Sequence, residues 1–289
     1  MPVESRQRPP GDAPAGAPPK ARAARSAVAR AGTRLSRWLP IVPAIVTLAG
    51  WEWASGRLIR EIYVSRPTAV LQRLVEVFGS GEIVPHLRTT GLEIALGYGI
   101  GFVTGAIVGY VLGRSRGLAR VFEPYVMAFY GIPKIAFAPL FIIWFGIGIG
   151  SKVALSAIMV FFLVFFNVYV GVRSVDRDLV NVAAVMGASQ RQLTRYIYLP
   201  ATMPFITMGA RAALPYSVIG VIVGEFTSAT SGLGLFMYTA SVTFDPAGVF
   251  TGVVILLIFI LAANALLGRA ESHLLRWQPD AGKQSSASP

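Results

Sequence analysis

The chain has 289 residues, of which 54% are hydrophobic and only 14% are charged, and it contains no cysteine. Soluble domains carry about 25% charged residues, so this composition argues against a soluble globular protein. Without cysteine, disulfide bonds, thiolate metal sites and a cysteine nucleophile are excluded. A formal charge of +12 would suggest nucleic-acid binding in a soluble protein, whereas in a chain this apolar it is typical of membrane orientation.

Charge-free runs locate the predicted membrane spans. Three runs are long enough to cross a bilayer as helices, and they are enclosed by Glu93 and Arg114, by Lys152 and Arg173, and by Asp245 and Arg269. Three weaker segments are interrupted by a charge, a proline or both, and they are 38–55, 125–145 and 203–224. The sequence therefore predicts an all-α, polytopic integral membrane protein with about six transmembrane helices.

The distribution of Lys and Arg predicts the orientation of these spans. Six spans place both chain ends and the second and fourth connecting loops on one side, and most Lys and Arg lie on that side. Basic residues concentrate on the cytoplasmic side of membrane proteins. We therefore expect a multi-pass protein of the plasma (inner) membrane with its N- and C-termini in the cytoplasm.

The chain divides into five predicted regions. Residues 1–37 are basic and lack large apolar side chains, which predicts a disordered cytoplasmic tail. We interpret this tail as solvated beside anionic lipid headgroups rather than bound to nucleic acid, and we expect membrane lipid but no nucleic acid as a partner. The first transmembrane helix is predicted over 38–55. An extracytoplasmic loop over 56–86, a core of five spans over 87–268 and a cytoplasmic tail over 269–289 follow.

A stripe of glycines marks the second span. Its members recur at every fourth position, and they are Gly97, Gly101, Gly105, Gly109 and Gly113. This spacing puts all five on one helix face, where another helix backbone can approach closely. The partner could be another span of the same chain or a second copy of the chain, and the pattern leaves both open.

Motifs for nucleotide and metal chemistry are absent. The sequence has no phosphate-binding Gly-x-x-x-x-Gly-Lys-[Ser/Thr], no Gly-x-Gly-x-x-Gly and no His-Glu-x-x-His. We expect no catalytic residue, metal site or cofactor in this chain, so that ATP would have to be bound by another protein. Polar residues within the spans are scattered and include no nucleophile–base pair, and they are Lys134, Asn167, Arg211 and Glu225.

The cytoplasmic loop over 173–203 is the most informative segment. Asp176 suits a helix N-terminus, Gly187 can end that helix with a positive φ, and Ser189 can cap a second short helix that continues to about residue 198. Pro200 and Pro204 are predicted to redirect the chain into the fifth span. A short amphipathic helix on this face could dock a soluble partner, or the segment could be an ordinary connection.

This loop resembles the signature of permease subunits of ABC importers, which reads Glu-Ala-Ala, three residues, Gly, nine residues, Ile, one residue and Leu-Pro. The matching positions are Gly187, Ile197, Leu199 and Pro200. The Glu-Ala-Ala positions fall on Asn181, Val182 and Ala183, so only the last matches and the carboxylate is missing. Further stretches resemble the nitrate/sulfonate/taurine branch of these permeases, and they are 51–52, 131–140, 144–148, 171–176 and 231–234.

The resemblance implies a binding-protein-dependent importer permease fold and a set of partners. Two permease chains, expected here as a homodimer, would form the pathway. A dimer of cytoplasmic ABC ATPases would bind ATP and Mg and dock on the coupling residues of this loop. These coupling residues are Asn181, Val182, Ala183, Gly187, Ser189, Ile197, Leu199 and Pro200. An extracytoplasmic solute-binding protein would deliver the solute. ATP binding would push the loops and switch the pathway between inward- and outward-facing states.

Charged and proline residues within the spans are candidates for the translocation path. Lys134 lies between Pro133 and Pro139 inside the third predicted span, where a charge is costly unless it faces a wet cavity. It could attract an anion or be a structural lysine. Arg211 is expected to be an inter-helix anchor or a ligand, and Glu225 is placed near the outer face as a candidate gate residue.

We therefore interpret the chain as the permease subunit of an ATP-driven importer, without enzymatic activity of its own. The expected solute is a small organic or inorganic anion such as nitrate, a sulfonate or taurine. The same machinery importing a thiamine-precursor pyrimidine or another vitamin is the alternative. A secondary transporter or an intramembrane enzyme, working without an ATPase, is a further alternative.

Overall fold

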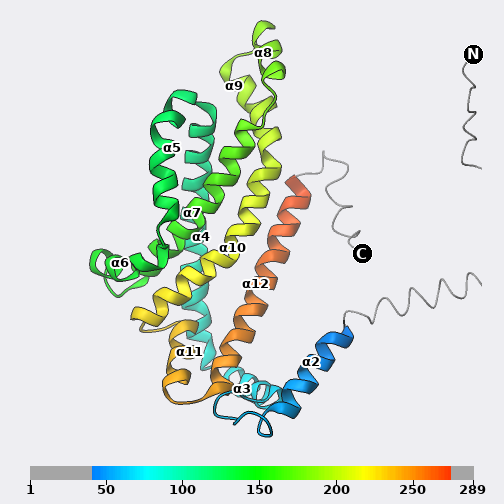
Figure 1. Ribbon diagram of the computed structural model, residues 1–289, viewed down its shortest axis with the longest axis vertical. Coiled ribbons are helices and arrows are strands. Elements are labelled where there is room, and N and C mark those ends of the chain that lie inside the picture. The colour runs from blue at the N-terminus through cyan, green and yellow to red at the C-terminus, as the bar shows by residue number, and fades with distance from the viewer. Residues whose placement is uncertain (1–40, 275–289) are drawn as a thin grey trace, which may run out of the picture. The chain divides into compact units, whose positions relative to one another are not determined.

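The structure is a computed structural model that describes residues 41–274, which are largely helical (Figure 1). Within this range no β-strand forms, and an isolated bridge joins Ser55 and Ile59. Within the described residues, those up to Ile59 and those from Arg60 onward form two compact units. The first contains α2 (Ile41–Ala54), which covers most of the predicted first span. The predicted tail over 1–37 and the last part of the tail over 269–289 lie outside the described residues.

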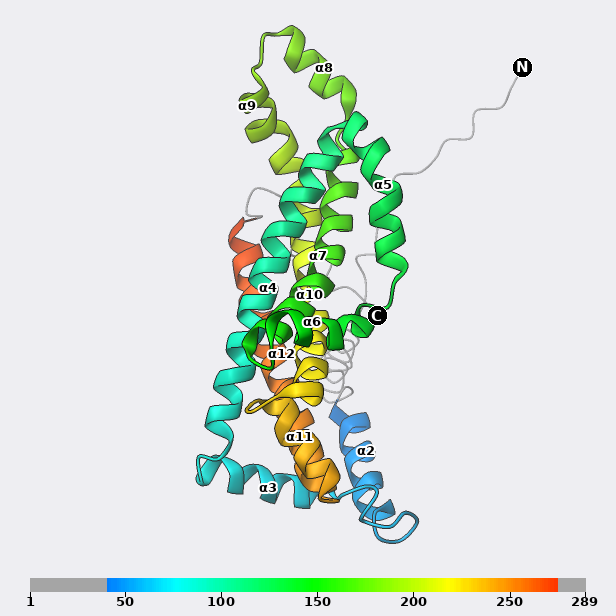
Figure 2. The same ribbon diagram turned by 90° about the vertical axis from the view of Figure 1, so that its left-hand side faces the viewer.

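The second unit is an assembly of long and short helices. They are α3 (Pro67–Gly79), α4 (Ile83–Arg114), α5 (Arg116–Gly131), α6 (Ala138–Phe145), α7 (Ile149–Arg173), α8 (Arg177–Val185), α9 (Gln190–Leu193), α10 (Leu199–Ser228), α11 (Leu233–Val242) and α12 (Pro246–Leu274). A 3₁₀ turn, Lys134–Phe137, precedes α6, and a π-helical turn, Thr194–Tyr198, precedes α10. Within this unit α8 and α9 lie at one end, and α3 and α11 lie at the opposite end (Figures 1 and 2).

Four helices among residues 41–274 are long and apolar enough to cross a membrane, namely α4, α7, α12 and the continuous helix from Gln190 to Ser228. The helix pair Arg116–Gly131 and Lys134–Phe145 brings the number to five when it is counted as one span. The remaining predicted span is represented by α2, whose 14 described residues fall short of the roughly 20 that a helix needs to cross a bilayer. Spans two and six also begin and end differently from the charge-free runs, since α4 starts at Ile83 inside the predicted extracytoplasmic loop and α12 continues past residue 268.

Helices α4 and α7 pack at very close range through the glycine stripe. A Cβ atom added to Gly101 would lie 2.4 Å from the carbonyl oxygen of Ala157, and one added to Gly105 would lie 2.6 Å from that of Phe161. Contacts of the same kind occur along the whole stripe, at Gly97, Gly109 and Gly113. Any side chain larger than hydrogen would push the two backbones apart, so the stripe faces a helix of its own chain.

The apolar core is shared by different helices at the two ends. Near α3, the buried side chains come from α3, α4, α10, α11 and α12 and include Val77, Ile83, Val221 and Leu233. Further toward α8, the core lies between α4, α7 and α10, and α5 adds a smaller cluster on the side of Phe165 and Tyr169. Many large apolar side chains elsewhere are exposed, as lipid-facing helices require.

The third predicted span is broken, as its proline residues indicate. The chain bends by 86° between α5 and the 3₁₀ turn that leads into α6, so 125–145 is a broken or re-entrant segment. Pro133 explains the position of the break, because a proline disfavours helical geometry in the residue before it. Ile132 accordingly adopts an extended conformation, with φ −75° and ψ 134°. Lys134 lies at this break rather than inside a continuous helix, and Pro139 is in the first turn of α6.

The predicted break at Pro200 is wrong. The chain continues as one helical segment from Gln190 to Ser228. Pro200 lies in the first turn of α10, where a missing N–H is tolerated, and the π-helical turn before it adjusts the backbone without interrupting it. Pro204 lies inside α10 and does not end it either.

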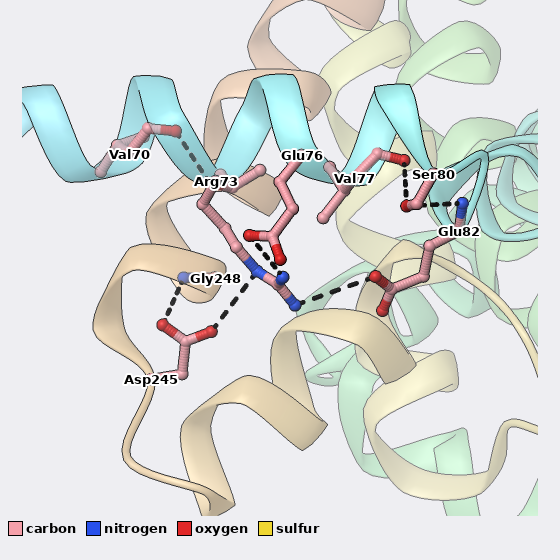
Figure 3. A network of polar contacts seen from close by, with 9 residues as sticks. Val70, Arg73, Glu76, Val77, Ser80, Glu82, Asp245 and Gly248 are labelled. Carbon is pink, nitrogen blue, oxygen red and sulfur yellow. Dashed lines mark hydrogen bonds and ion pairs between the residues drawn. The ribbon is translucent and has the colours of Figure 1, made fainter.

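The α3 end is held by an ion network around Arg73 (Figure 3). The guanidinium of Arg73 lies 2.9 Å from Glu76 on its own helix, 3.9 Å from Glu82 just before α4, and 3.8 Å from Asp245 before α12. The hydrogen bond with Glu76, together with the charges of Glu82 and Asp245, raises the pKa of Arg73 above its ordinary value. Because Asp245 also accepts the backbone N–H of Gly248 at 2.9 Å, Arg73 links α3 to the cap of α12.

Candidate coupling loop and translocation path

The helix α8 is defined at both ends by local hydrogen bonds. Asp176 caps its N-terminus by accepting the backbone N–H of Asp178 at 2.8 Å. Gly187 ends it with a φ of +88°, as its position predicts. The backbone N–H of Ala188 donates to Ala183 and that of Gly187 to Ala184, both at 3.0 Å, which is the Schellman pattern that glycine favours at helix C-termini.

A capping box starts the next helix, α9. The hydroxyl of Ser189 accepts the N–H of Gln192 at 3.3 Å, and the side chain of Gln192 accepts the N–H of Ser189 at 2.8 Å. Contacts with α4 then fix α9 against the rest of the fold. Arg114 donates to the side chain of Gln190 at 2.6 Å, and Tyr110 donates to Thr194 at 3.1 Å.

These bonds leave α8 projecting with apolar side chains uncovered. Val185 is 89% exposed and Met186 is 83% exposed, and Leu179 and Val182 are exposed as well. Soluble surfaces seldom show clustered apolar side chains unless a partner covers them. The residues predicted to couple to an ATPase divide into two groups. Five lie on α8 or at the turn after it, namely Asn181, Val182, Ala183, Gly187 and Ser189, and three lie at the start of the long helix, namely Ile197, Leu199 and Pro200.

A basic cavity of about 390 Å³ lies at the base of α8. Four arginines are among the residues that line it together with Asn181, and they are Arg114, Arg116, Arg173 and Arg177. Arg114 also stacks over the ring of Tyr198 at 4.0 Å from its centroid. Asn181 stands where the ABC-permease signature has its glutamate. The cavity therefore lacks a negative charge that this glutamate would supply, and its lining is more positive.

Lys134 contributes to a second cavity of about 380 Å³ at the break between α5 and α6. Its ammonium lies 4.4 Å from the ring centroid of Tyr130 and 4.9 Å from that of Phe162, and it donates to the carbonyl of Tyr130. Tyr216 of α10 closes the cavity from another side, and Pro133 also lines it. Pro139 is not among the residues lining this cavity.

Arg211 lies in a different place. It forms an ion pair with Glu271 and so links α10 to α12. The adjoining cavity of about 160 Å³ is lined mainly by apolar atoms and is separate from the one at Lys134. This position agrees with an inter-helix anchor, the first of the two roles considered for Arg211.

Glu225 is almost completely buried near the end of α10. Its carboxyl accepts the hydroxyl of Thr90 at 2.6 Å and the backbone N–H of Gly234 at 2.5 Å.

Two further charged residues of this site, Glu93 and Lys152, were missed by sequence reasoning because they were taken as the polar ends of charge-free runs. The signal that could have found them is a charge that directly adjoins a long apolar run. The structure thus keeps Lys134, Arg211 and Glu225 in three separate environments.

Between residues 41 and 274 no group of three or more His, Asp or Glu side chains is placed to hold a metal ion.

Comparison with known proteins decides the family. Residues 101–276 match the model of the binding-protein-dependent transport system inner membrane component. The chain belongs to this family. This assignment confirms the resemblance to ABC-importer permeases, and it makes the chain a transport subunit rather than an enzyme. Family members are multi-pass proteins of the inner membrane that act with a separate ATPase and a binding protein. A secondary transporter and an intramembrane enzyme are therefore no longer candidates.

Individual relatives cover nearly the same length. The formylaminopyrimidine transport permease protein ThiX of Halalkalibacterium halodurans is 32% identical over 240 residues, which are 83% of this chain and 95% of ThiX. The taurine transport system permease protein TauC of Escherichia coli is 27% identical over 239 residues, 81% of this chain and 87% of TauC. A solved structure of the MetNI methionine ABC transporter, in an inward-facing conformation, shares the fold, with a TM-score of 0.57, 22% identity, and coverage of 67% of this chain and 94% of that chain.

Proposed function

We propose that this permease imports a small anionic solute, and that a cytoplasmic ATPase dimer drives it through the α8–α9 loop. Two copies of the chain form the pathway, a solute-binding protein docks at the α3 end, and both termini lie in the cytoplasm. ATP binding draws the two coupling loops together and opens the pathway outward. The observation that carries the coupling role is the projecting α8, which exposes Val185 and Met186 while its two ends are fixed by local caps.

The coupling role is tested by Gly187→Val. Nothing lies within 4 Å of a Cβ at this position, so the change acts through the backbone, whose φ of +88° a β-branched residue resists. We expect uptake to fall while insertion into the membrane persists. Gly117→Val is the matched control, because Gly117 is equally uncrowded, lies in the first turn of α5 and has no positive φ. Normal uptake by Gly187→Val would contradict the assignment.

An anionic solute is supported by Lys134. Its ammonium contacts aromatic rings and a carbonyl in a cavity of the broken span, and it has no carboxylate partner in the described part of the chain. An unneutralised cation at such a depth favours anions on the pathway. Sulfonates and taurine satisfy this requirement, and the taurine permease TauC is a relative.

The second candidate solute is an aminopyrimidine. Three aromatic rings line the same cavity, those of Tyr130, Phe162 and Tyr216, and planar heterocycles stack on such rings. ThiX, a formylaminopyrimidine permease by name, is the relative that supports it.

Lys134→Ala separates the two solutes. In proteoliposomes containing the full importer, we expect Lys134→Ala to lower uptake of a sulfonate substantially, with assembly of the importer unchanged. Phe162→Leu, which removes a ring but keeps an apolar side chain, should have the smaller effect. The reverse ranking would favour the pyrimidine, and equal loss of uptake and assembly in Lys134→Ala would show that the lysine is structural.

A further inference from the structure

Three ionisable side chains that are almost completely buried meet at the α3 end of the bundle. Glu93 of α4 and Lys152 of α7 are each 2% exposed, and Glu225 of α10 is 1% exposed. Removing a charge from water without compensation costs several kcal/mol, and ionisable groups within membrane spans are rare for that reason. The cluster therefore needs an arrangement that reduces its net charge.

Two members of the cluster have complete hydrogen bonding in their charged forms. Lys152 donates to the carbonyl of Gly148 at 3.0 Å and also to those of Ile147 and Ser228, which accounts for all three protons of an ammonium. Both oxygens of Glu225 accept hydrogen bonds, one from Thr90 and one from the backbone of Gly234. A carboxylate, with acceptors only, fits this position, whereas a protonated Glu225 would point a proton toward a donor.

Glu93, in contrast, does not have complete hydrogen bonding. Its Oε2 atom is enclosed, and no donor lies against it. In the part of the chain that the structure describes, Glu93 forms no ion pair. It lies one turn of α4 beyond Thr90, the residue that donates to Glu225. A buried carboxylate with no ion pair and with an oxygen that no donor faces is costly, so this environment favours the neutral, protonated form of Glu93.

We propose that Glu93 is protonated in the resting protein, so that Glu93, Glu225 and Lys152 together form an electroneutral proton-holding site. One ammonium, one carboxylate and one neutral acid leave no net charge in the buried cluster. The proton comes from solvent during folding and remains on Glu93. This assignment depends neither on the identity of the solute nor on the docking of an ATPase.

The site holds three separate turns together, which gives it a positioning role. Through Lys152 it binds the turn before α7 and the end of α10, and through Glu225 and Thr90 it binds the first residues of α11. His86, the other titratable side chain facing this turn, bonds to Gly232 from α4 through its Nδ1 atom, at 2.8 Å from the carbonyl oxygen. These bonds keep the turn between α10 and α11 against α4.

Two neutral substitutions distinguish the protonated acid from the ionised one. In the full importer reconstituted in liposomes, we expect Glu93→Gln to keep uptake within about twofold, because a neutral amide of the same shape replaces a neutral acid. We expect Glu225→Gln to lower uptake by more than about tenfold, because one of its two acceptor oxygens becomes a donor that faces a donor. Equal losses in the two variants, or two tolerated substitutions, would overturn the proposal.

Infrared spectroscopy tests the proton directly and does not depend on the activity of the variants. At neutral pH the wild-type protein should show the carbonyl stretch of a protonated carboxyl group, shifted in ²H₂O. This band should disappear in Glu93→Gln and persist in Glu82→Gln, where an exposed carboxylate of the neighbouring turn is removed. An unchanged band in Glu93→Gln, or no such band in the wild type, would refute a proton on Glu93.

Discussion

The two ends of the helical unit are held by different kinds of interaction. Around α8, the caps that define the helix and the start of α9 join residues two to five positions apart, such as Asp176 with Asp178 and Ser189 with Gln192. Among the described residues, longer-range bonds reach only α9 and the turn after it, from Arg114 and Tyr110 of α4. At the α3 end, the bonds join distant segments. Thr90 and Glu225 are 135 positions apart, and Thr251 and the carbonyl of Val70 are 181 positions apart.

This difference suits two different roles, binding of a partner at the α8 end and stabilisation of the fold at the α3 end. The helix α8 can keep its shape through local caps while its apolar side chains remain uncovered, and α9 connects it to α4. The α3 end forms only when α3, α4, α7, α10 and α11 have assembled, and it closes the turns between them. Substitutions at the first end should therefore affect coupling, and those at the second end should affect the stability of the whole fold.

The largest effect is expected from Thr90→Val at the α3 end. The substitution keeps the shape but leaves Glu225 Oε1 and the backbone N–H of Leu233 unpaired and buried, at about 1–3 kcal/mol of unfolding free energy for each group. Thermal unfolding in detergent should show the loss. Thr104→Val is the matched control, since the Thr104 hydroxyl bonds only carbonyls of its own helix. Similar unfolding temperatures for the two variants would remove the distinction between the ends.

A smaller but still clear loss is expected from Gly101→Val, between the two ends. The new Cβ would lie 2.4 Å from the carbonyl of Ala157, and overpacking of this kind costs about 1–3 kcal/mol. Gly99→Val on the same helix meets nothing within 4 Å and should be tolerated. If the two variants unfold alike, the stripe does not pack against α7 and would be free to face a second copy of the chain.

Ser189→Ala should separate stability from coupling. Loss of an N-cap costs about 1 kcal/mol of local helix stability, and Ser115→Ala, which uncaps α5, costs a similar amount. We expect both variants to insert and assemble, while only Ser189→Ala weakens the solute-dependent stimulation of ATP hydrolysis. Equal stimulation in the two variants would argue against a role of the α9 cap in coupling.

The smallest effect is expected from Arg211→Gln. Half-exposed ion pairs contribute about 0.2–1 kcal/mol, so stability should fall slightly and the KM for uptake should not change. Glu271→Gln should behave alike, and the double variant should lose no more than either single one. An increase in KM confined to Arg211→Gln would instead place Arg211 on the translocation path.

Local chemistry explains which features could be predicted from sequence. The caps of α8 and α9 depend on Asp176, Gly187 and Ser189, whose side chains or backbone act within a few residues, and the sequence indicates all three. The pair of prolines indicated the bend at Ile132 but not its angle, because the direction of α6 after the bend also involves its packing on α7, where Phe141 and Leu155 share a buried cluster. The neutral cluster was not visible, since Glu93, Lys152 and Glu225 are brought together only by the assembled fold.

The central claim, that α8 is the surface on which the ATPase acts, is tested most directly by cross-linking. The natural chain has no cysteine, so Val185→Cys introduces a unique thiol at a highly exposed position on the loop. We predict that a short thiol-reactive cross-linker joins it to the ATPase subunit, with a yield that changes when ATP is bound. Ile143→Cys, 78% exposed on α6, should remain unlinked. Equal cross-linking from both positions, or none from Val185→Cys in an importer that hydrolyses ATP in response to solute, would contradict the account.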